Sequence, residues 1–141
     1  MAVYDKAKWH FEGQCPKELP IYQGYVHIGL YLGWAVERGF AGKLLNKDFT
    51  EEVSQFLNGR ISGPRLLEIT DGVLDDQMLS EEGNRFTSAY YGAEKDGYYS
   101  DYEATFPHMD SIYHVQNTPE SFDKIKACLD GRLATWRANQ K

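Results

Sequence analysis

The chain is 141 residues long, a size that fits one domain, and we expect residues 1–141 to form a single helical domain. Hydrophobic residues make up 42% of the chain, which is enough to bury a core without a metal or a disulfide framework. The formal net charge of −6 argues against nonspecific nucleic-acid binding, because phosphate neutralisation requires lysine and arginine.

The negative charge is concentrated between Glu68 and Asp110, where eleven acidic residues stand against two basic ones. This segment suits a cationic partner, and solubility alone would explain it equally well. Cys15 and Cys128 are the only cysteines, and their spacing fits neither a disulfide framework nor a zinc motif. The first residues lack the apolar region of a secretory signal, so we expect a reducing, cytoplasmic location. A disulfide bridge between the two cysteines is an alternative that the sequence leaves open.

Residues 4–20 predict an irregular lead, in which alternating polar and aromatic positions favour a short strand or an extended segment. Pro16 and Pro20 stop any helix before the central one starts. A central helix follows, over about residues 21–38. It contains the longest apolar run of the chain, residues 25–36, and is apolar nearly all round. Twelve residues are too few to cross a bilayer, which needs about 20, so we expect other helices to enclose this one.

Within the central helix, Gly29 and Gly33 lie one turn apart and would let another helix approach closely. Gly39 supplies a left-handed stop. A second helix is expected over residues 49–57, with Asp48 as its cap and Glu51 completing a capping box.

A third helix should start at Pro64 and a fourth at the cap Ser80. Residues 98–102 predict a helical turn, and residues 112–115 a short strand. Thr118, Pro119 and apolar residues at helical spacing predict a long C-terminal helix over about 119–138. The expected fold class is therefore mainly α, with at most a short β element.

The four histidines form no recognised metal arrangement, and the sequence predicts neither a metal nor a cofactor. His27 lies inside the buried run. We expect it to hydrogen-bond a backbone carbonyl or a tyrosine hydroxyl rather than to act as a ligand or base. Cys15 with a histidine could in principle form a nucleophile and base, but a buried thiol fits better.

The tyrosine-rich acidic segment from Tyr90 to Glu103 is the most informative surface candidate. Tyrosine gives a large contact area at low entropic cost, and the flanking carboxylates would steer a basic partner. The alternative, held equally, is that these tyrosines cover the core with their hydroxyls outward.

Several segments of the chain form a recognisable set. They begin with Tyr4-Asp5-Lys6-Ala7-Lys8-Trp9-His10, Leu19-Pro20, Tyr25-Val26-His27-Ile28-Gly29 and Leu32-Gly33-Trp34. They continue through Gly63-Pro64-Arg65-Leu66-Leu67, Leu79-Ser80-Glu81-Glu82-Gly83-Asn84, Asp101-Tyr102-Glu103 and the helix ending near Trp136. In these segments the chain resembles a family of small bacterial proteins of unassigned activity. The family offers no catalytic motif. By analogy of type, it is similar to immunity proteins that accompany secreted antibacterial toxins.

The resemblance implies a non-enzymatic immunity protein of the cytoplasm, without nucleic-acid or membrane partners, that occludes the basic active-site cleft of a cognate toxin. The expected contacts are Asp75, Asp76, Glu94, Asp96, Tyr98, Tyr99, Asp101 and Tyr102. The alternative is a small-ligand-binding domain or enzyme with a pocket near Trp9, His10, His27 and Trp34. A third hypothesis is a structural subunit of a larger assembly. Imidazoles and a carboxylate converging in a crevice would favour catalysis, whereas widely separated histidines would remove the alternative.

Overall fold

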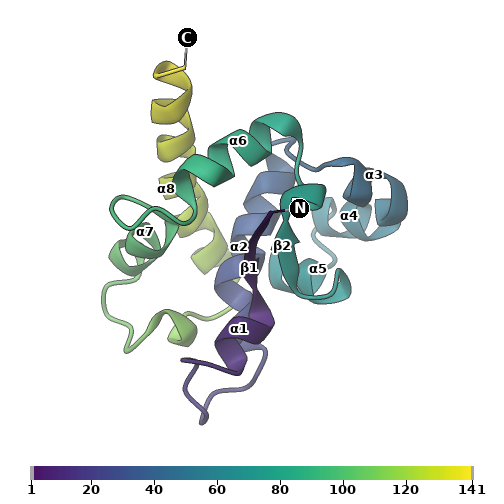
Figure 1. Ribbon diagram of the computed structural model, residues 1–141. Coiled ribbons are helices and arrows are strands. Elements are labelled where there is room, and N and C mark those ends of the chain that lie inside the picture. The colour runs from purple at the N-terminus through teal and green to yellow at the C-terminus, as the bar shows by residue number, and fades with distance from the viewer. Residues whose placement is uncertain (1, 141) are drawn as a thin grey trace.

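The computed structural model describes residues 2–140 and is mainly α-helical, as the sequence predicts. The elements, in chain order, are β1 (Val3–Lys6), α1 (Ala7–Phe11), α2 (Gln23–Glu37), α3 (Lys43–Asp48), α4 (Thr50–Leu57), α5 (Gly63–Ile69), β2 (Val73–Asp75), the 3-10 turn η1 (Asp76–Met78), α6 (Glu81–Tyr90), α7 (Tyr98–Thr105), the 3-10 turn η2 (Ile112–His114) and α8 (Pro119–Ala138). Figure 1 shows them arranged around α2, with α8 as the longest helix.

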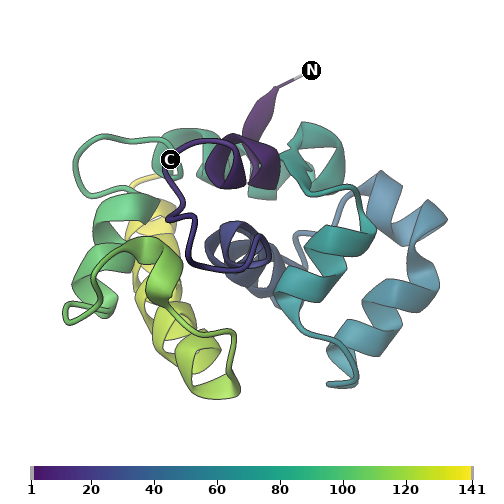
Figure 2. The same ribbon diagram turned by 90° about the horizontal axis from the view of Figure 1, so that it is seen from below.

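The central helix α2 is enclosed by protein, as predicted from its apolar run. All of its residues except Tyr25 and Glu37 are buried. Figure 2 looks nearly along α2 and shows α1, α5, α7 and α8 placed around it. No helix within residues 2–140 is long and apolar enough to cross a membrane.

Two glycines set the distance between α2 and α5. A Cβ on Gly29 would lie 2.2 Å from the Cα of Pro64, and a Cβ on Gly63 would lie 2.2 Å from the carbonyl oxygen of Gly29. The two backbones are therefore in direct contact. One turn later, a Cβ on Gly33 would lie 2.9 Å from the ring of Phe56. The predicted close approach along this face is confirmed.

Several helix ends follow the predicted signals. Gly39 has a φ of +81°, and the Phe40 amide that follows it donates to the Ala35 carbonyl at 2.8 Å, which closes the end of α2. Ser80 and Thr118 cap α6 and α8, because their side chains accept from the amides of Gly83 and Ser121.

The predicted capping box of the second helix is wrong. Asp48 belongs to α3, a helix that the sequence did not predict, and α4 begins at Thr50 after Phe49, which makes no side-chain cap. The short strand expected at residues 112–115 is also wrong. There the Ser111 hydroxyl accepts from the Tyr113 amide and starts the 3-10 turn η2 instead.

The N-terminal segment contains the short strand that the sequence allowed and a helix, α1, that the sequence did not predict. β1 pairs with β2 in antiparallel fashion, with Val3 opposite Asp75 and Lys6 opposite Val73. The chain then turns directly into α1, whose first amide, that of Ala7, donates to the carbonyl of Gly72 at 2.9 Å. This arrangement brings the acidic side chain of β1 and the histidine of α1 to the same side of α2.

Candidate functional site

Polar side chains from five elements meet beside the N-terminal half of α2. We call them the Asp5 cluster: Asp5 of β1, His10 of α1, His27 of α2, Tyr91 directly after α6, Tyr99 of α7 and Tyr113 of η2. Asp5, His27 and Tyr91 are buried, with exposed fractions of 3%, 1% and 3%. A cluster of ionisable groups inside a helical core is costly unless every group is hydrogen-bonded.

The carboxylate of Asp5 is the acceptor at the centre of this cluster. Its Oδ2 accepts from the hydroxyls of Tyr91 at 2.6 Å and Tyr99 at 2.5 Å. Its Oδ1 lies 2.7 Å from Nε2 of His10 and accepts from the Lys6 amide at 2.9 Å. Within residues 2–140, only histidines lie within salt-bridge distance of this carboxylate. Asp5 is thus a buried anion held by hydrogen-bond donors rather than by a lysine or arginine.

The two histidine rings pack edge to face, with their centroids 4.4 Å apart. Nδ1 of His10 lies 2.6 Å from the Tyr113 hydroxyl. Nε2 of His27 lies 3.2 Å from the Tyr99 hydroxyl and 3.6 Å from Oδ2 of Asp5, the latter a polar contact rather than a hydrogen bond. His27 therefore meets a tyrosine hydroxyl, one of the two partners expected from the sequence.

One assignment of the protons satisfies these contacts. His10 donates from Nε2 to Asp5 and accepts at Nδ1 from Tyr113, while His27 donates from Nε2 to the Tyr99 oxygen. In this assignment, each of these hydrogen bonds is donated either to the Asp5 carboxylate or to a group that itself donates to that carboxylate. Nδ1 of His27 is buried and has no partner among the described residues.

The surroundings fix the charge of the cluster. Burial alone would raise the pKa of Asp5, but the His10 hydrogen bond and the polar contact with His27 outweigh it and hold that pKa well below its usual range. Burial lowers the pKa of His27, so its ring is neutral at pH 7. Burial and the Asp5 charge raise the pKa of Tyr91 and of Tyr99, and both keep their protons. Such perturbed groups are typical of functional sites, although structural networks also produce them.

An open cleft of about 770 Å³ reaches the Asp5 cluster from solvent. His10, Tyr99 and Tyr113 line it from the cluster, and Trp9 and Glu103 line it from its surroundings. The side chain of His10 is 12% exposed, compared with 4% for Asp5 and 1% for His27. His10 is therefore the histidine of the cluster that a molecule in the cleft can reach.

The fourth residue of the predicted pocket lies elsewhere. Trp34 follows His27 by two helical turns and is fully buried. Its Nε1 donates to Asp130 of α8 at 2.9 Å, and its ring packs on Phe86. Trp9, His10 and His27 are brought together as the alternative hypothesis required. The inclusion of Trp34 is wrong, because seven residues of helix place it about 10 Å further along α2 than His27, against Asp130 and Phe86.

The predicted partner-binding residues do not form one exposed face. Tyr98 and Tyr102 are buried, and the Tyr98 hydroxyl donates to the His27 carbonyl. Asp101 is buried as well, where it accepts from Arg132 at 2.7 and 2.9 Å and from Tyr90 at 2.6 Å. These three side chains serve the core, because α7 turns them toward α2 and α8.

Of the five remaining predicted contacts, Tyr99 is half-buried and belongs to the Asp5 cluster, and the other four are divided between two places. Asp75 and Asp76 are half-buried at the β2–η1 junction, where the Asp76 carboxylate accepts from the Ala2 amide at 3.0 Å. Glu94 and Asp96 are exposed in the loop after α6. The ten residues of α6, about 15 Å of helix, separate the two pairs along the chain.

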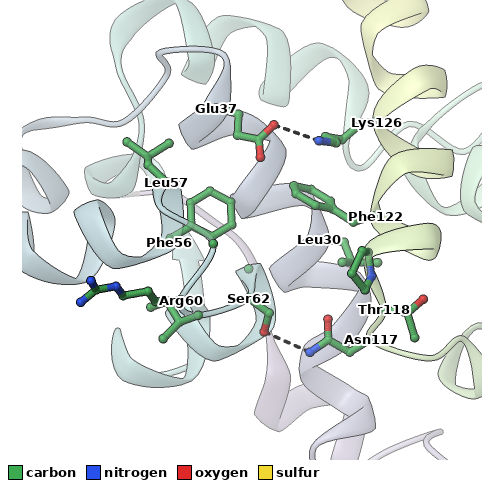
Figure 3. Close-up of a pocket in the computed structure, with 14 residues that line it drawn as sticks. Leu30, Glu37, Phe56, Leu57, Arg60, Ser62, Asn117, Thr118, Phe122 and Lys126 are labelled. Carbon is green, nitrogen blue, oxygen red and sulfur yellow. Dashed lines mark hydrogen bonds and ion pairs between the residues drawn. The ribbon is translucent and has the colours of Figure 1, made fainter.

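A second hollow lies on the other side of the molecule, between α2, α4 and α8, and sequence reasoning did not find it. Its volume is about 350 Å³. Figure 3 shows the rings of Phe56 and Phe122 on either side of it, with the Glu37–Lys126 ion pair (3.1 Å) and the Ser62–Asn117 hydrogen bond (3.0 Å) at its edges. It contains no cluster of histidines and carboxylates within the described part of the chain.

Sequence reasoning also missed Asp5 as a site residue, together with Tyr91 and Tyr113. The alternation of the opening segment was the available signal, because in a strand it turns Asp5 to the face opposite its neighbours. Cys15 lies beside the cluster, since its amide donates to the His10 carbonyl at 3.0 Å. Burial and Glu18 raise the pKa of its thiol, so the thiolate that a nucleophile requires is disfavoured.

Comparison with known proteins gives one result. A family model described as a domain of unknown function, DUF7832, matches residues 3–115, a range that includes the whole Asp5 cluster and ends before α8. No curated protein and no solved structure matches the chain. Because the family match spans well over half of the sequence, this chain belongs to the DUF7832 family, a domain of unknown function.

Proposed function

We propose that the protein is a small ligand-binding protein of enzyme type, whose ligand lies in the cleft over the Asp5 cluster and exchanges a proton with His10. The observation that carries the proposal is the convergence of Asp5, His10 and His27 below an open cleft. A concave site with a few converging polar groups and perturbed pKa values is the usual form of a small-molecule site.

The lining of the cleft indicates the class of ligand. Trp9 is 54% exposed, and an indole ring attracts planar and cationic groups. The Lys6 ammonium already lies 5.6 Å from the centroid of this ring, so a ligand would share the ring with Lys6 or displace it. Glu103 and Asp110 are exposed acids in the lining, and no lysine or arginine of the described chain lines it. The Asp5 charge lies below. The cleft therefore suits a small planar molecule that carries a cationic or hydrogen-bond-donating group.

The geometry around His10 suits proton transfer. A carboxylate that accepts from one ring nitrogen fixes the tautomer and stabilises the imidazolium when the other nitrogen takes a proton. Here Asp5 accepts from Nε2, and Nδ1 faces the Tyr113 hydroxyl, which lines the cleft. A ligand donor bonded to the Tyr113 oxygen would pass its proton to that oxygen while Tyr113 passes its own proton to Nδ1. Such a positioned base contributes about 10²–10⁴-fold in rate.

A ligand screen with two matched variants tests the proposed site. Trp9 and Leu57 are both exposed hydrophobic residues, at 54% and 56%, but Trp9 lines this cleft and Leu57 lines the hollow of Figure 3. Planar amines and amidines would be screened by ligand-observed NMR. We expect Trp9→Ala to weaken binding by about tenfold or more, since an aromatic contact with a cation contributes about 1–2 kcal/mol, and Leu57→Ala to leave it unchanged. The opposite pattern would move the site to the other hollow.

The second candidate function is neutralisation of a toxin by direct binding, in the cytoplasm. It is supported by the acidic surplus of residues 68–110, by the exposed Glu94 and Asp96 and by the two free cysteines, which fit a reducing compartment. Its expected face is reduced to the loop after α6, because Tyr98, Asp101 and Tyr102 are buried. Co-purification with a toxin encoded beside the gene would favour it over the ligand-binding proposal.

A further inference from the structure

The Asp5 cluster has the donor set of a metal site. An Asp5 carboxylate oxygen and one ring nitrogen each from His10 and His27 lie within 4.8 Å of one another. Two imidazoles and a carboxylate are the protein ligands of many catalytic zinc sites and of non-haem iron sites. The three residues come from β1, α1 and α2, so the packing of the fold, and not a local sequence motif, assembles them.

We propose that the Asp5 cluster binds one first-row divalent metal ion of the zinc type through Asp5, Nε2 of His10 and Nε2 of His27. The proposal goes beyond the proposed function. It uses the same cleft but makes His10 a metal ligand, whose Nδ1 then carries a proton and no longer acts as the base. It uses the location of that site but does not depend on any organic ligand.

The distances between the donors fit one small ion. Ligands about 2.0–2.1 Å from a tetrahedral zinc ion lie about 3.3 Å from one another. In the structure, Nε2 of His10 lies 2.7 Å from Oδ1 of Asp5 and Nε2 of His27 lies 3.6 Å from Oδ2, and one donor atom from each of the three residues lies within 4.8 Å of the others. To bind one ion, the hydrogen-bonded His10–Asp5 pair would have to open by about 0.6 Å, a shift that rotation of the His10 side chain at the cleft can supply.

The histidines can also adopt the tautomers that a metal requires, with the Nε2 hydrogen bonds to Asp5 and Tyr99 replaced by bonds to the ion. Each ring would present its Nε2 lone pair and carry its proton on Nδ1. For His10, the Tyr113 oxygen at 2.6 Å would accept that proton, and such a hydrogen bond orients a metal-bound histidine. For His27, Nδ1 lacks a partner in either tautomer among residues 2–140. The metal would supply the positive charge that no lysine or arginine provides to Asp5.

The fourth position of such a site faces the cleft. The Tyr99 hydroxyl lies 3.0 Å from Nε2 of His10 and 3.2 Å from Nε2 of His27, so it stands next to the ion. As a hydroxyl, it is a weaker zinc donor than the imidazole and carboxylate ligands. That weak donor can give way to water or to a ligand from the cleft. Three firm ligands and one replaceable position are the arrangement of catalytic rather than structural zinc sites.

Metal titration of the full chain tests the proposal. Protein washed with a chelator is titrated with Zn²⁺ against a chromogenic chelator, and with Co²⁺ while visible absorption is recorded. We expect one ion per chain with a dissociation constant in the micromolar range or below, and weaker binding at pH 5.5 than at pH 7.5, because protons compete for imidazole. A dissociation constant of about a millimolar or weaker for the wild type would overturn the proposal.

Two histidine variants locate the ion. His10→Ala removes a ligand at the partly exposed edge of the cluster, whereas His114→Ala removes a histidine whose ring bonds Ser111, outside the cluster. We expect about 100-fold weaker zinc binding for the first and no change for the second, with circular dichroism confirming that both fold. Equal binding by the two variants would overturn the metal site. Ligand binding by chelator-treated protein would then still support the proposed function, so the two failures are distinguishable.

Discussion

The two halves of α2 show different ways of burying a polar group. The first half carries His27, which faces an anion, a second imidazole and three tyrosines. The second half carries Tyr31 and Trp34 in a dry aromatic core. The side-chain polar atom of each of these two residues has one partner. The Tyr31 hydroxyl pairs with the neutral hydroxyl of Thr87 at 2.9 Å, and the Trp34 nitrogen donates to Asp130, whose side chain is partly exposed.

The difference concerns what each half contributes. The aromatic half buries a large apolar area and should account for much of the stability. The histidine half collects ionisable groups, and replacing buried charged groups by apolar side chains of similar volume is often neutral or stabilising. A fold that keeps a buried anion and two histidines beside a cleft has the form expected of a site. Variants in the two halves should therefore differ in pH dependence as well as in size of effect.

The largest effect is expected in the aromatic half. Trp34→Ala removes a fully buried indole and should lower the free energy of unfolding by about 3–5 kcal/mol, as measured by urea denaturation. The loss should be the same at pH 5 and pH 7, because the side chain does not titrate. Trp34→Phe keeps part of the ring contacts and should cost less. A loss below about 1 kcal/mol for Trp34→Ala would show that this half does not dominate the core.

Asp5→Asn should have the next largest effect, and this effect should depend on pH. The variant keeps the shape but removes the charge that four donors share, at a cost of about 3 kcal/mol at pH 7. Because the pKa of Asp5 is lowered in the folded chain, its stabilisation is complete above the unfolded value of about 4 and is lost as the pH falls further. Urea titrations of metal-free protein at pH 7, 5 and 3 should show the deficit of the variant narrowing at pH 3. A constant deficit would mean that Asp5 is not charged in the fold.

The sequence predicted the parts of this fold that local chemistry controls. The apolar run of α2, the φ-positive stop at Gly39 and the caps Ser80 and Thr118 each act within one or two turns, and all four are present. The glycine contact with α5 was expected in kind, although the partner, Pro64, could not be named. Asp48 does not cap α4, because it is the last residue of α3, a helix that the sequence did not predict.

The site could not be predicted in the same way. Asp5 and His10 are five residues apart, but His27, Tyr99 and Tyr113 reach them from separate elements, and no local pattern encodes that convergence. For the tyrosines of α7, the sequence supported two hypotheses equally: an exposed partner-binding face, or a cover over the core. Their burial depends on the packing of α7 against α2 and α8, which becomes visible only in three dimensions (Figure 2).

His27→Gln should have a smaller effect, which should appear as a change in how steeply the free energy of unfolding varies with pH. The pKa of His27 is lowered in the folded chain, so below about pH 6.5 the unfolded chain takes up a proton that the folded chain does not. This group therefore stabilises the wild type fully above that pH, and its contribution falls by up to about 1.4 kcal/mol per pH unit below it. Glutamine can still donate to Tyr99 but does not titrate, so the variant should lose that part of the slope between pH 6.5 and 5. His108→Gln, at an exposed position, is the matched control and should keep the wild-type slope.

The smallest effect on stability is expected in the loop after α6, and it separates the two candidate functions. Glu94 is exposed, and Asp96 has a φ of +59°, a conformation that asparagine also tolerates, so Glu94→Lys with Asp96→Asn should change stability by less than about 0.5 kcal/mol. If a basic partner docks on this loop, the double variant should slow association severalfold at low salt and reduce its salt dependence, as measured by surface plasmon resonance. Asp101 is unsuitable for such a test, because its pairing with Arg132 inside the fold would make a charge reversal unfold the chain. Unchanged association with a co-purified toxin would exclude the loop as the contact, while ligand and metal binding at the Asp5 cluster should be unaffected by either substitution.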